Sequence, residues 1–511
     1  MNYLDWSIII LFLGTMTAIG MYFSRKNKNI HDYFLGGRSM PEWMVALSVV
    51  GASISAGTFI GAPQLAFDSN LTYLLLSVGA ILGGLMAAII FMPSLYKADT
   101  ITIYGYLGKR FGQGAVTASS IVFMLGVLLM AGSRLFIAAI AVSVMLYNDI
   151  LLPNLVISIV ILGIITTIYT MKGGIKGLIV IDAIQSLIVI VTGIVCIYFI
   201  LKAIPAPVSE IANALKNAPE GNKLLLFDTG LSLKQPYNLV GALIACTIFK
   251  FAQFGTDQEF VQRSLTCRSV AKASRSLIFS QLISLPVVLI FMIIGFLLYI
   301  FYACPGLMGT AVPSEVLNDS RQVFPQYMFN HLPSGLLGLL MVGLLSAALG
   351  SFNSAINAMT SSFVSDILIP LKNRKKKKSE QHSGGEMKQS KLMVVVMGAL
   401  LTVFAVIAAF MQEAGGQTLV DFALGVMSFS YAGLLGVFLC AIFTRRGNVK
   451  TVVAALITGI IVVFAQQPFI MPLWSPWVFG QEIELAWPWW VVVGGMVSFA
   501  VCCIGKKKLS D

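Results

Sequence analysis

Long apolar stretches, separated by short polar segments, recur along almost the whole chain. A helix rises about 1.5 Å per residue, so about 20 apolar residues are enough to cross roughly 30 Å of hydrocarbon. Dividing the chain at its polar breaks predicts an all-α integral membrane protein, with about thirteen transmembrane helices in one domain over residues 1–511. The predicted spans are 5–23, 42–67, 71–95, 116–147, 153–170, 178–203, 237–262, 275–303, 334–367, 391–412, 418–444, 449–470 and 486–504.

The composition agrees with this pattern, because 57% of the 511 residues are hydrophobic and 11% are charged, with a mean hydropathy of +0.87. A soluble domain carries about 25% charged residues, so a water-soluble fold is excluded. The three His and seven Cys form neither paired CxxC motifs nor HExxH, which are usual spacings of zinc sites. No nucleophile has a neighbouring His base, so we do not expect an enzyme.

The polar loops differ in charge from one side of the membrane to the other. Alternate loops hold most of the 34 Lys and Arg, including a basic loop at 371–391. Basic residues accumulate on cytoplasmic loops, so the pattern predicts an external N-terminus and a cytoplasmic C-terminus. It also explains the net charge of +12 without a nucleic-acid partner. The basic side includes Arg38, Lys97, Lys109, Arg110, Lys176, Arg263, Arg268, Lys272, Arg275, Arg445, Arg446 and Lys450, and the opposite side holds Lys202, Lys216, Lys223, Lys234 and Arg321.

Two of the predicted spans contain interruptions. Small and hydroxyl residues fill 51–61 in the middle of the second span, and residues 254–258 (FGTDQ) interrupt the seventh. Unwound backbone is tolerated at membrane depth where it is buried in protein or lines a wet cavity, although small residues can also serve close helix packing. The two spans are five helices apart and cross in opposite directions, as in two inverted repeats, here 42–203 and 237–444.

Four further motifs lie in order along the chain. Each is weak alone, but their ordered combination is specific and covers most of the chain. They are DYFLGGRSMP at 32–41, Gly173-Gly174-Ile175 followed by Asp182 and Gln185, the segment 255–263, and the segment 346–354.

With these motifs the sequence resembles the sodium:solute symporter family. The resemblance implies a LeuT-like core, preceded by an additional helix and loop at 5–41 and followed by two further helices at 449–504. It also implies a secondary active transporter of the cell membrane, which carries a small organic solute with a sodium ion by alternating access. Its partners would be the solute, the ion and the lipid bilayer, with no cofactor and with the monomer as the functional unit. A solute sensor or channel on the same scaffold is the alternative of another class.

The resemblance places a sodium ion at the backbone carbonyls of Gly51, Ile54 and Gly343 and at the hydroxyl of Ser346. Sodium is a hard ion that takes oxygen ligands, and backbone dipoles can replace its water. This chain departs from the family pattern at Ala347, where a second hydroxyl residue is usual. Proton coupling therefore stays open beside sodium coupling.

Asp182 lies within an apolar span, where a carboxylate is costly and rarely lacks a role. The resemblance links its position to cation coupling. An ion pair with Arg134 is the structural alternative. Some relatives bind a second sodium ion through further hydroxyls, but Leu349 and Gly350 occupy those positions here, which favours a single coupled ion.

The same resemblance points to the class of solute. Sugar carriers use long polar side chains on the second span, where this chain has Ser53, Gly57 and Thr58, so a hexose is disfavoured. Ser55 and Thr58 match hydroxyl positions of sialic acid carriers, which also place an Arg where this chain has Arg134.

Two cations in the interior, Arg134 and Lys250, favour an anionic solute, because an Arg can hold a carboxylate through two parallel hydrogen bonds. Structural packing of either side chain remains the alternative, and an amino acid carrier is the runner-up. The predicted carboxylate site, for an organic acid or a sialic acid-like solute, consists of Arg134, Ser55, Thr58, Ser53, Lys250, Gln253 and Phe254.

Overall fold

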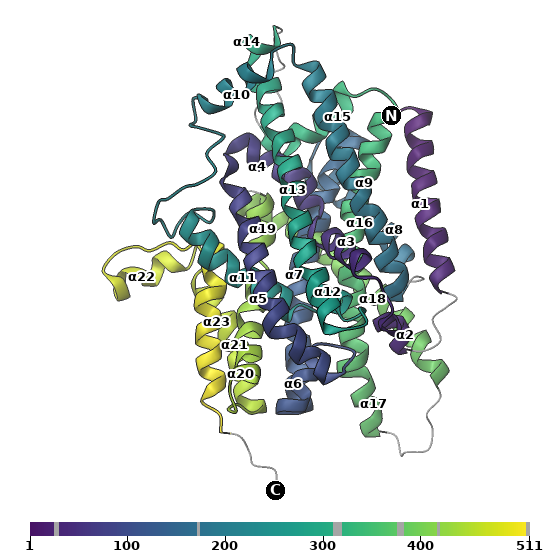
Figure 1. Ribbon diagram of the computed structural model, residues 1–511, viewed down its shortest axis with the longest axis vertical. Helices are drawn as coiled ribbons and strands as arrows, with labels where there is room; N and C mark the ends of the chain where they lie inside the picture. Colours follow the sequence, from purple (N-terminus) through teal and green to yellow (C-terminus); the bar gives the residue numbers. More distant parts are fainter. Residues whose placement is uncertain (25–29, 171–173, 310–318, 376–382, 416–418, 507–511) are drawn as a thin grey trace.

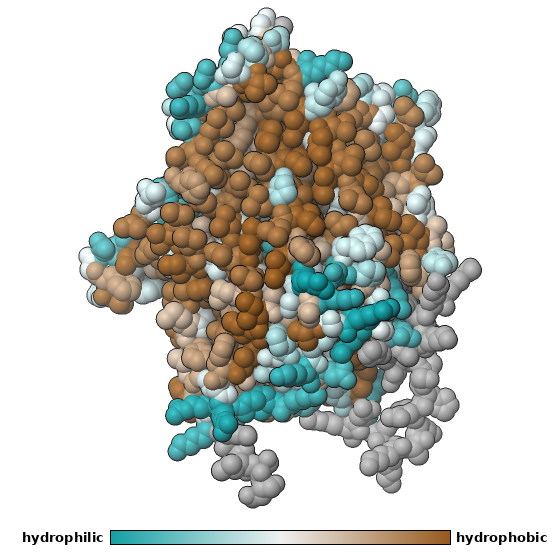
Figure 2. Space-filling model, viewed as in Figure 1, coloured by the Kyte–Doolittle hydropathy of each residue, from teal (hydrophilic) through white to brown (hydrophobic). Residues whose placement is uncertain are grey.

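The computed structural model describes residues 1–24, 30–170, 174–309, 319–375, 383–415 and 419–506. Within these ranges the chain forms helices and no strand. The start of α1 (Tyr3–Ser24) and the end of α23 (Trp487–Cys503) lie toward opposite ends of the long axis (Figure 1). Figure 2 shows hydrophobic residues over most of the visible face, with hydrophilic residues at its upper tip and along its lower edge. This is the surface of a protein that spans a bilayer.

Seven of the described helices are long and apolar enough to cross a membrane, and a bent pair forms an eighth candidate. Five apolar helices of 10–17 residues accompany them. The total of thirteen spans stays a prediction, because length and composition identify seven or eight of the described helices as membrane spans. The long helices are α1, α5 (Leu75–Ala98), α7 (Gln113–Tyr147), α9 (Gly174–Ala203), α13 (Val270–Ala303), α16 (Leu336–Ser362) and α18 (Ser383–Gly415), and the shorter ones include α8 (Leu152–Thr170), α11 (Thr247–Thr256), α20 (Ser428–Phe443), α21 (Val449–Ala465) and α23.

Both interruptions expected from the sequence are present. In the second span, α3 (Glu42–Ser53) stops before Ile54, whose backbone is extended, and the chain resumes as a π-helix at Gly57–Gly61 and as α4 (Ala62–Asp68). The two halves are bent by 62°. In the seventh span, α11 stops before the extended residue Asp257, and α12 (Gln258–Ser264) follows.

Ser55 redirects the backbone hydrogen bonds at the first break. The amide of Gly57 donates to Ser55 Oγ at 3.2 Å, and the amide of Thr58 donates to Ser55 O at 2.9 Å. In a continuous helix these two amides would bond the carbonyls of Ser53 and Ile54. The break therefore removes the helical hydrogen bonds that these two carbonyls would accept.

Glycines bring helices into close contact around both broken spans. A Cβ at Gly83 would lie 2.6 Å from the amide nitrogen of Phe251, and one at Gly79 would lie 2.8 Å from Cβ of Cys246. Real Cβ contacts are not this short, so α5 packs against the seventh span through residues that must stay small. This is the small-residue packing usual between membrane helices.

Two elements differ from the sequence expectation. The predicted span 418–444 is divided into α19 (Leu419–Gly425) and α20, with a turn between them. The predicted loop 371–391 is partly helical, because α17 (Ile369–Lys375) and α18 extend into it, and residues 376–382 lie outside the described ranges. Short helices also occupy the connections: α2 (Ile30–Leu35), α6 (Tyr104–Phe111), α10 (Val208–Lys216), α14 (Pro305–Met308), α15 (Val323–His331) and α22 (Met471–Phe479).

Two cations assigned to loops from the sequence are buried instead. Arg263 is 1% exposed at the end of the seventh span, and Lys223 is 2% exposed. Lys223 Nζ donates to the carbonyls of Phe67 at 2.7 Å and Ser69 at 3.3 Å, which caps the end of α4. Burial lowers the pKa of Lys223. Neither residue counts toward the charge difference between the loops, because each donates hydrogen bonds to acceptors inside the protein.

Candidate functional site

A cavity opens beside the first break. It contains about 740 Å³ of space between atoms, including its mouth. Helices far apart in the sequence contribute its walls, because the broken second span meets α5, α7, α11, α13 and α19 there. Its lining residues are Ser53, Ile54, Ser55, Gly57, Thr58, Tyr73, Leu76, Ser77, Ala80, Arg134, Lys250, Gln253, Gln281, Ser284, Val288, Val420 and Leu424.

This cavity brings together six of the seven predicted solute residues. The exception is Phe254, which is 1% exposed and does not line the cavity. Its ring packs edge-on against Phe260 with centroids 5.5 Å apart. Phe254 thus lies in the apolar core of the broken seventh span. The six residues that do line the cavity are Ser53, Ser55, Thr58, Arg134, Lys250 and Gln253.

Arg134 places a guanidinium at the cavity from the middle of α7. It is 7% exposed, and its Nη1 donates to the carbonyl of Ala52 at 3.4 Å. Its nearest carboxylate among the described residues is Glu259, with 3.9 Å between Nη1 and Oε1. This distance is too long for a hydrogen bond, so hydrogen-bonding capacity of the guanidinium remains for a ligand.

Lys250 enters the same cavity from α11. Its Nζ donates to Oε1 of Gln253 at 2.9 Å, one turn along the helix. The amino group also lies 5.7 Å from the ring centroid of Phe249 and 5.9 Å from that of Phe254. Lys250 is therefore held inside the protein and does not extend to a membrane surface.

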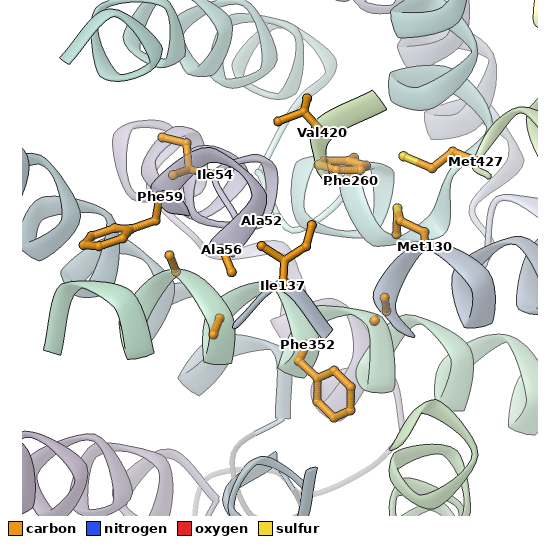
Figure 3. Close-up of a cluster of buried hydrophobic side chains, with 14 of the residues drawn as sticks. Ala52, Ile54, Ala56, Phe59, Met130, Ile137, Phe260, Phe352, Val420 and Met427 are labelled. Carbon is orange, nitrogen blue, oxygen red and sulfur yellow. The ribbon is translucent and has the colours of Figure 1, made fainter. Parts of the chain in front are cut away.

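Apolar side chains form the wall behind the break. Figure 3 shows Ile54, Ala56 and Phe59 of the broken span beside side chains of other elements. These side chains exclude water from the sides of the polar cavity and so strengthen electrostatic interactions within it. The neighbours labelled there include Met130 and Ile137 of α7, Phe260 of α12 and Val420 of α19.

The partner of Asp182 is Arg263, so the alternative in which Asp182 pairs with Arg134 is wrong. Oδ2 of Asp182 lies 2.8 Å from Nη2 of Arg263 and accepts from Ser48 Oγ at 2.8 Å. Arg263 also donates to Ser354 Oγ and to the carbonyl of Glu259. The pair joins α9 to α12 in the interior and leaves Arg134 free of this carboxylate.

The second oxygen of Asp182 faces a different group of oxygens. Asp182 Oδ1 and Gln185 Oε1 are both buried without a hydrogen-bond partner among the described residues. A Cβ at Gly350 would lie 3.8 Å from Asp182 Oδ1, 3.1 Å from Gln185 Oε1 and 3.6 Å from the carbonyl of Gly51. Three oxygens thus surround a position where α16 carries no side chain.

Of the predicted cation residues, Gly51 lies in α3, Gly343 and Ser346 lie in α16, and Asp182 lies in α9, and these three helices pack against one another. Ser346 is 1% exposed, and its Oγ has no hydrogen-bond partner in the described part of the chain. A buried hydroxyl without a partner is costly, so a ligand for it is expected. Gly343 lies one turn earlier on α16, where a Cβ would lie 2.5 Å from Thr192 Oγ1 of α9 and 3.1 Å from the Phe59 ring.

Two buried acids near the second break were missed in the sequence. Asp257 accepts from Tyr431 at 2.6 Å and from the amide of Glu259 at 2.8 Å, so it caps α12. Glu259 is fully buried close to Arg134. The sequence already indicates a role for both acids, because charged residues inside a predicted span usually have one.

The cavity residues missed by sequence reasoning are harder to recognise. Gln281 could have been noticed as a long polar residue in the apolar span 275–303. The others are ordinary residues of membrane helices, and only the packing of distant spans brings them to the cavity. They are Tyr73, Leu76, Ser77, Ala80, Ser284, Val288, Val420 and Leu424.

Residues 33–459 match the model of the sodium:solute symporter family. The chain belongs to this family. It is 26% identical to the sodium/sialic acid symporter SiaT of Proteus mirabilis (strain HI4320), over 91% of this chain and 89% of that protein. It is also 26% identical to the sodium-coupled monocarboxylate transporter 2 of Danio rerio, over 89% of this chain and 70% of that one.

Solved structures agree on the fold. A sodium-coupled sialic acid symporter in a substrate-bound outward-open state superposes with a TM-score of 0.81 at 24% identity, over 99% of this chain and 100% of that one. Mhp1, a nucleobase-cation-symport-1 family transporter, gives a TM-score of 0.52 at 13% identity, over 94% of each chain. The fold is therefore LeuT-like. As a member of the sodium:solute symporter family, the protein is a sodium-coupled solute symporter of the cell membrane. Sodium is its coupling ion, and solute and sodium are its partners.

Proposed function

We propose that the solute is a small anionic carboxylate, bound by Arg134 in the cavity beside the first break. The observation that carries this proposal is the guanidinium itself: it is buried, it lines a polar cavity, and among the described residues no carboxylate lies within hydrogen-bond distance of it. A planar guanidinium and a carboxylate match through two parallel hydrogen bonds. Two relatives named above carry sialic acid and monocarboxylates, which supports the same solute class.

The remaining polar groups of the cavity complete this site. The hydroxyls of Ser55 and Thr58 would bond polar groups of the solute, with Ser53 at the edge of the break. Lys250 adds a second positive charge, oriented by Gln253. An ammonium group on the solute would be repelled there, which makes an amino acid a poorer fit than a simple acid. Phe254 does not reach the cavity and would contribute by packing behind the residues that line it.

Sodium would bind between the first break and α16. The proposed ligands are the carbonyls of Gly51, Ile54 and Gly343 and the hydroxyl of Ser346, whose Oγ is buried without a partner among the described residues. Asp182 would assist from α9 through its unpaired oxygen. Movement of the two broken spans would then couple the ion to the solute, because both sites share the first break.

The proposed topology has an external N-terminus, a cytoplasmic C-terminus and two inverted repeats at 42–203 and 237–444. The opposite positions of the start of α1 and the end of α23 in Figure 1 support termini on opposite sides of the membrane, and the basic loops support a cytoplasmic C-terminus. The breaks at Ile54 and Asp257, one in each repeat, support the inverted repeats. The monomer is the proposed functional unit.

Uptake by purified protein in proteoliposomes tests the solute class. An inward sodium gradient is imposed, and labelled N-acetylneuraminate, lactate, pyruvate, glucose and proline are offered separately. We expect saturable, sodium-driven uptake of at least one of the three simple acids. Uptake of glucose or proline alone would contradict the proposal.

Two substitutions then test the role of Arg134. We expect Arg134→Gln to raise KM for the acid about 30-fold or more, since loss of one partner of a buried charge pair costs about 2 kcal/mol or more. Arg134→Lys keeps the charge but not the paired hydrogen bonds. Its KM for the acid should therefore lie between those of wild type and Arg134→Gln. Arg275→Gln is the matched control, because Arg275 is exposed and pairs with Glu42 at 3.1 Å, away from the cavity.

A further inference from the structure

The buried acids of the core differ in how many hydrogen-bond partners their carboxylate oxygens have. Asp257 receives hydrogen bonds on both oxygens, from Tyr431 and from the amide of Glu259. Asp182 holds Arg263 and Ser48 on one oxygen. Glu259 is fully buried, and neither of its oxygens has a hydrogen-bond partner in the described part of the chain.

The one cation within 4.0 Å of Glu259 among the described residues is Arg134. The other charges facing Glu259 are Asp257 at the start of its own helix, Arg263 one turn later, and Asp182 on α9. The phenol of Tyr431 on α20 is bonded to Asp257 and unavailable. Glu259 does not line the cavity, so it lies behind Arg134 as seen from the solute.

This arrangement makes two carboxylates compete for one guanidinium. We propose that Glu259 binds a proton when the solute carboxylate binds Arg134, so that a proton is carried together with sodium and solute. The inference rests on the proposed carboxylate function. An ionised carboxylate buried without donors or a close counter-charge is costly, and the incoming acid takes over the guanidinium that supplies that counter-charge.

The exchange balances in charge and atoms. On the outer side, the solute carboxylate and one proton from water enter, the solute pairs with Arg134, and Glu259 becomes the neutral acid. On the inner side, the solute leaves, Glu259 returns the proton to water, and its carboxylate again faces Arg134. A sodium ion is not expected at Glu259, because a hard cation needs several oxygens and those of Asp257 are already bonded.

The proton has an energetic consequence. One sodium ion and one carboxylate carry no net charge, so the membrane potential would contribute nothing to uptake. A proton restores one positive charge, so the membrane potential then contributes to uptake.

Charge movement and proton uptake test the proposal with the acid that shows the highest sodium-driven uptake in the solute panel. We expect wild-type protein to take up about one proton per bound acid, measured with a pH indicator in weakly buffered detergent solution. We also expect Glu259→Gln, which imitates the neutral acid, to retain sodium-driven uptake, to take up no proton, and to move about one charge fewer per solute in proteoliposomes. Glu220→Gln, at an exposed acid bonded to Tyr299, is the control and should behave as wild type.

The outcomes separate the two proposals. If wild-type protein transports none of the acids, the carboxylate function fails before any variant is made. If it transports an acid but takes up no proton on binding it, the proton site is overturned and the carboxylate function stands. Equal proton uptake and equal charge movement in wild type and Glu259→Gln would also overturn the proposed proton site at Glu259. If Glu259→Gln is inactive, the wild-type proton measurement decides alone.

Discussion

Nη2 of Arg263 in α12 lies 2.8 Å from Oδ2 of Asp182 in α9, with both side chains almost fully buried. The pair connects the second half of the broken seventh span to a helix of the first proposed repeat. Breaking a buried pair leaves one charge without compensation, which is far more costly than losing a surface pair. The contact therefore constrains the position of the second break.

We expect Asp182→Asn to destabilise the protein by about 3 to 5 kcal/mol. The change should appear as a lower melting midpoint and a lower yield of folded protein in detergent. Glu42→Gln is the comparison, because it breaks the partly exposed pair with Arg275 and should cost less than about 1 kcal/mol. Similar losses in the two variants would show that the buried pair does not stabilise the fold.

Sodium affinity should depend on the hydroxyls of α16. We expect Ser346→Ala to raise the sodium concentration for half-maximal uptake about tenfold, since one lost ligand costs roughly 1.4 kcal/mol. Ala347→Ser should lower it by restoring a second hydroxyl at the neighbouring position. The sodium dependence of solute uptake measures both effects.

Ser351→Ala provides the matched control for these variants. Ser351 is also buried on α16, but its hydroxyl bonds the carbonyls of Ala347 and Ala348 within the same helix. Its removal should leave the sodium dependence unchanged. A shift as large as that of Ser346→Ala would mean that the hydroxyls act through helix packing and not through the ion.

Local features of the sequence mark both breaks, although at the first they also fit close helix packing. At the first, small and hydroxyl residues weaken the helix, and Ser55 can replace a lost backbone bond with its own hydroxyl. At the second, Asp257 is a good residue to start a new helix, and it caps the amide of Glu259. These effects act within a few residues and therefore leave a visible pattern.

Contacts between distant spans left no such pattern. Arg263 follows a polar run that predicts a loop, whereas its partner Asp182 lies 81 residues earlier in the chain. Nothing local to Arg134 indicates that Glu259 approaches it. The cavity residues Tyr73 and Val420 are likewise ordinary in composition and become functional candidates through packing alone.

The N-terminal helix should stabilise the helix that carries Ser346. Oδ1 of Asp5 in α1 accepts from the amides of Gly335 at 2.7 Å and Gly338 at 2.8 Å, at the start of α16. Such a cap satisfies free amides and places negative charge at the positive end of the helix. We expect Asp5→Ala to cost about 1 to 2 kcal/mol, measured as a lower melting midpoint. Ser7→Ala is the control, because Ser7 is exposed and bonds its own helix.

Lys250 and Arg134 should contribute differently to the binding of the same solute. Lys250 is already bonded to Gln253 and presents a point charge, whereas Arg134 offers paired donors. We therefore expect Lys250→Met to raise KM for the acid by about tenfold, less than Arg134→Gln, and to leave the sodium dependence near that of wild type. Gln253→Leu should give a smaller increase, because it frees the Lys250 amino group without removing it. Uptake kinetics over a range of acid concentrations measure all three variants, and an unchanged KM in Lys250→Met would assign Lys250 to packing.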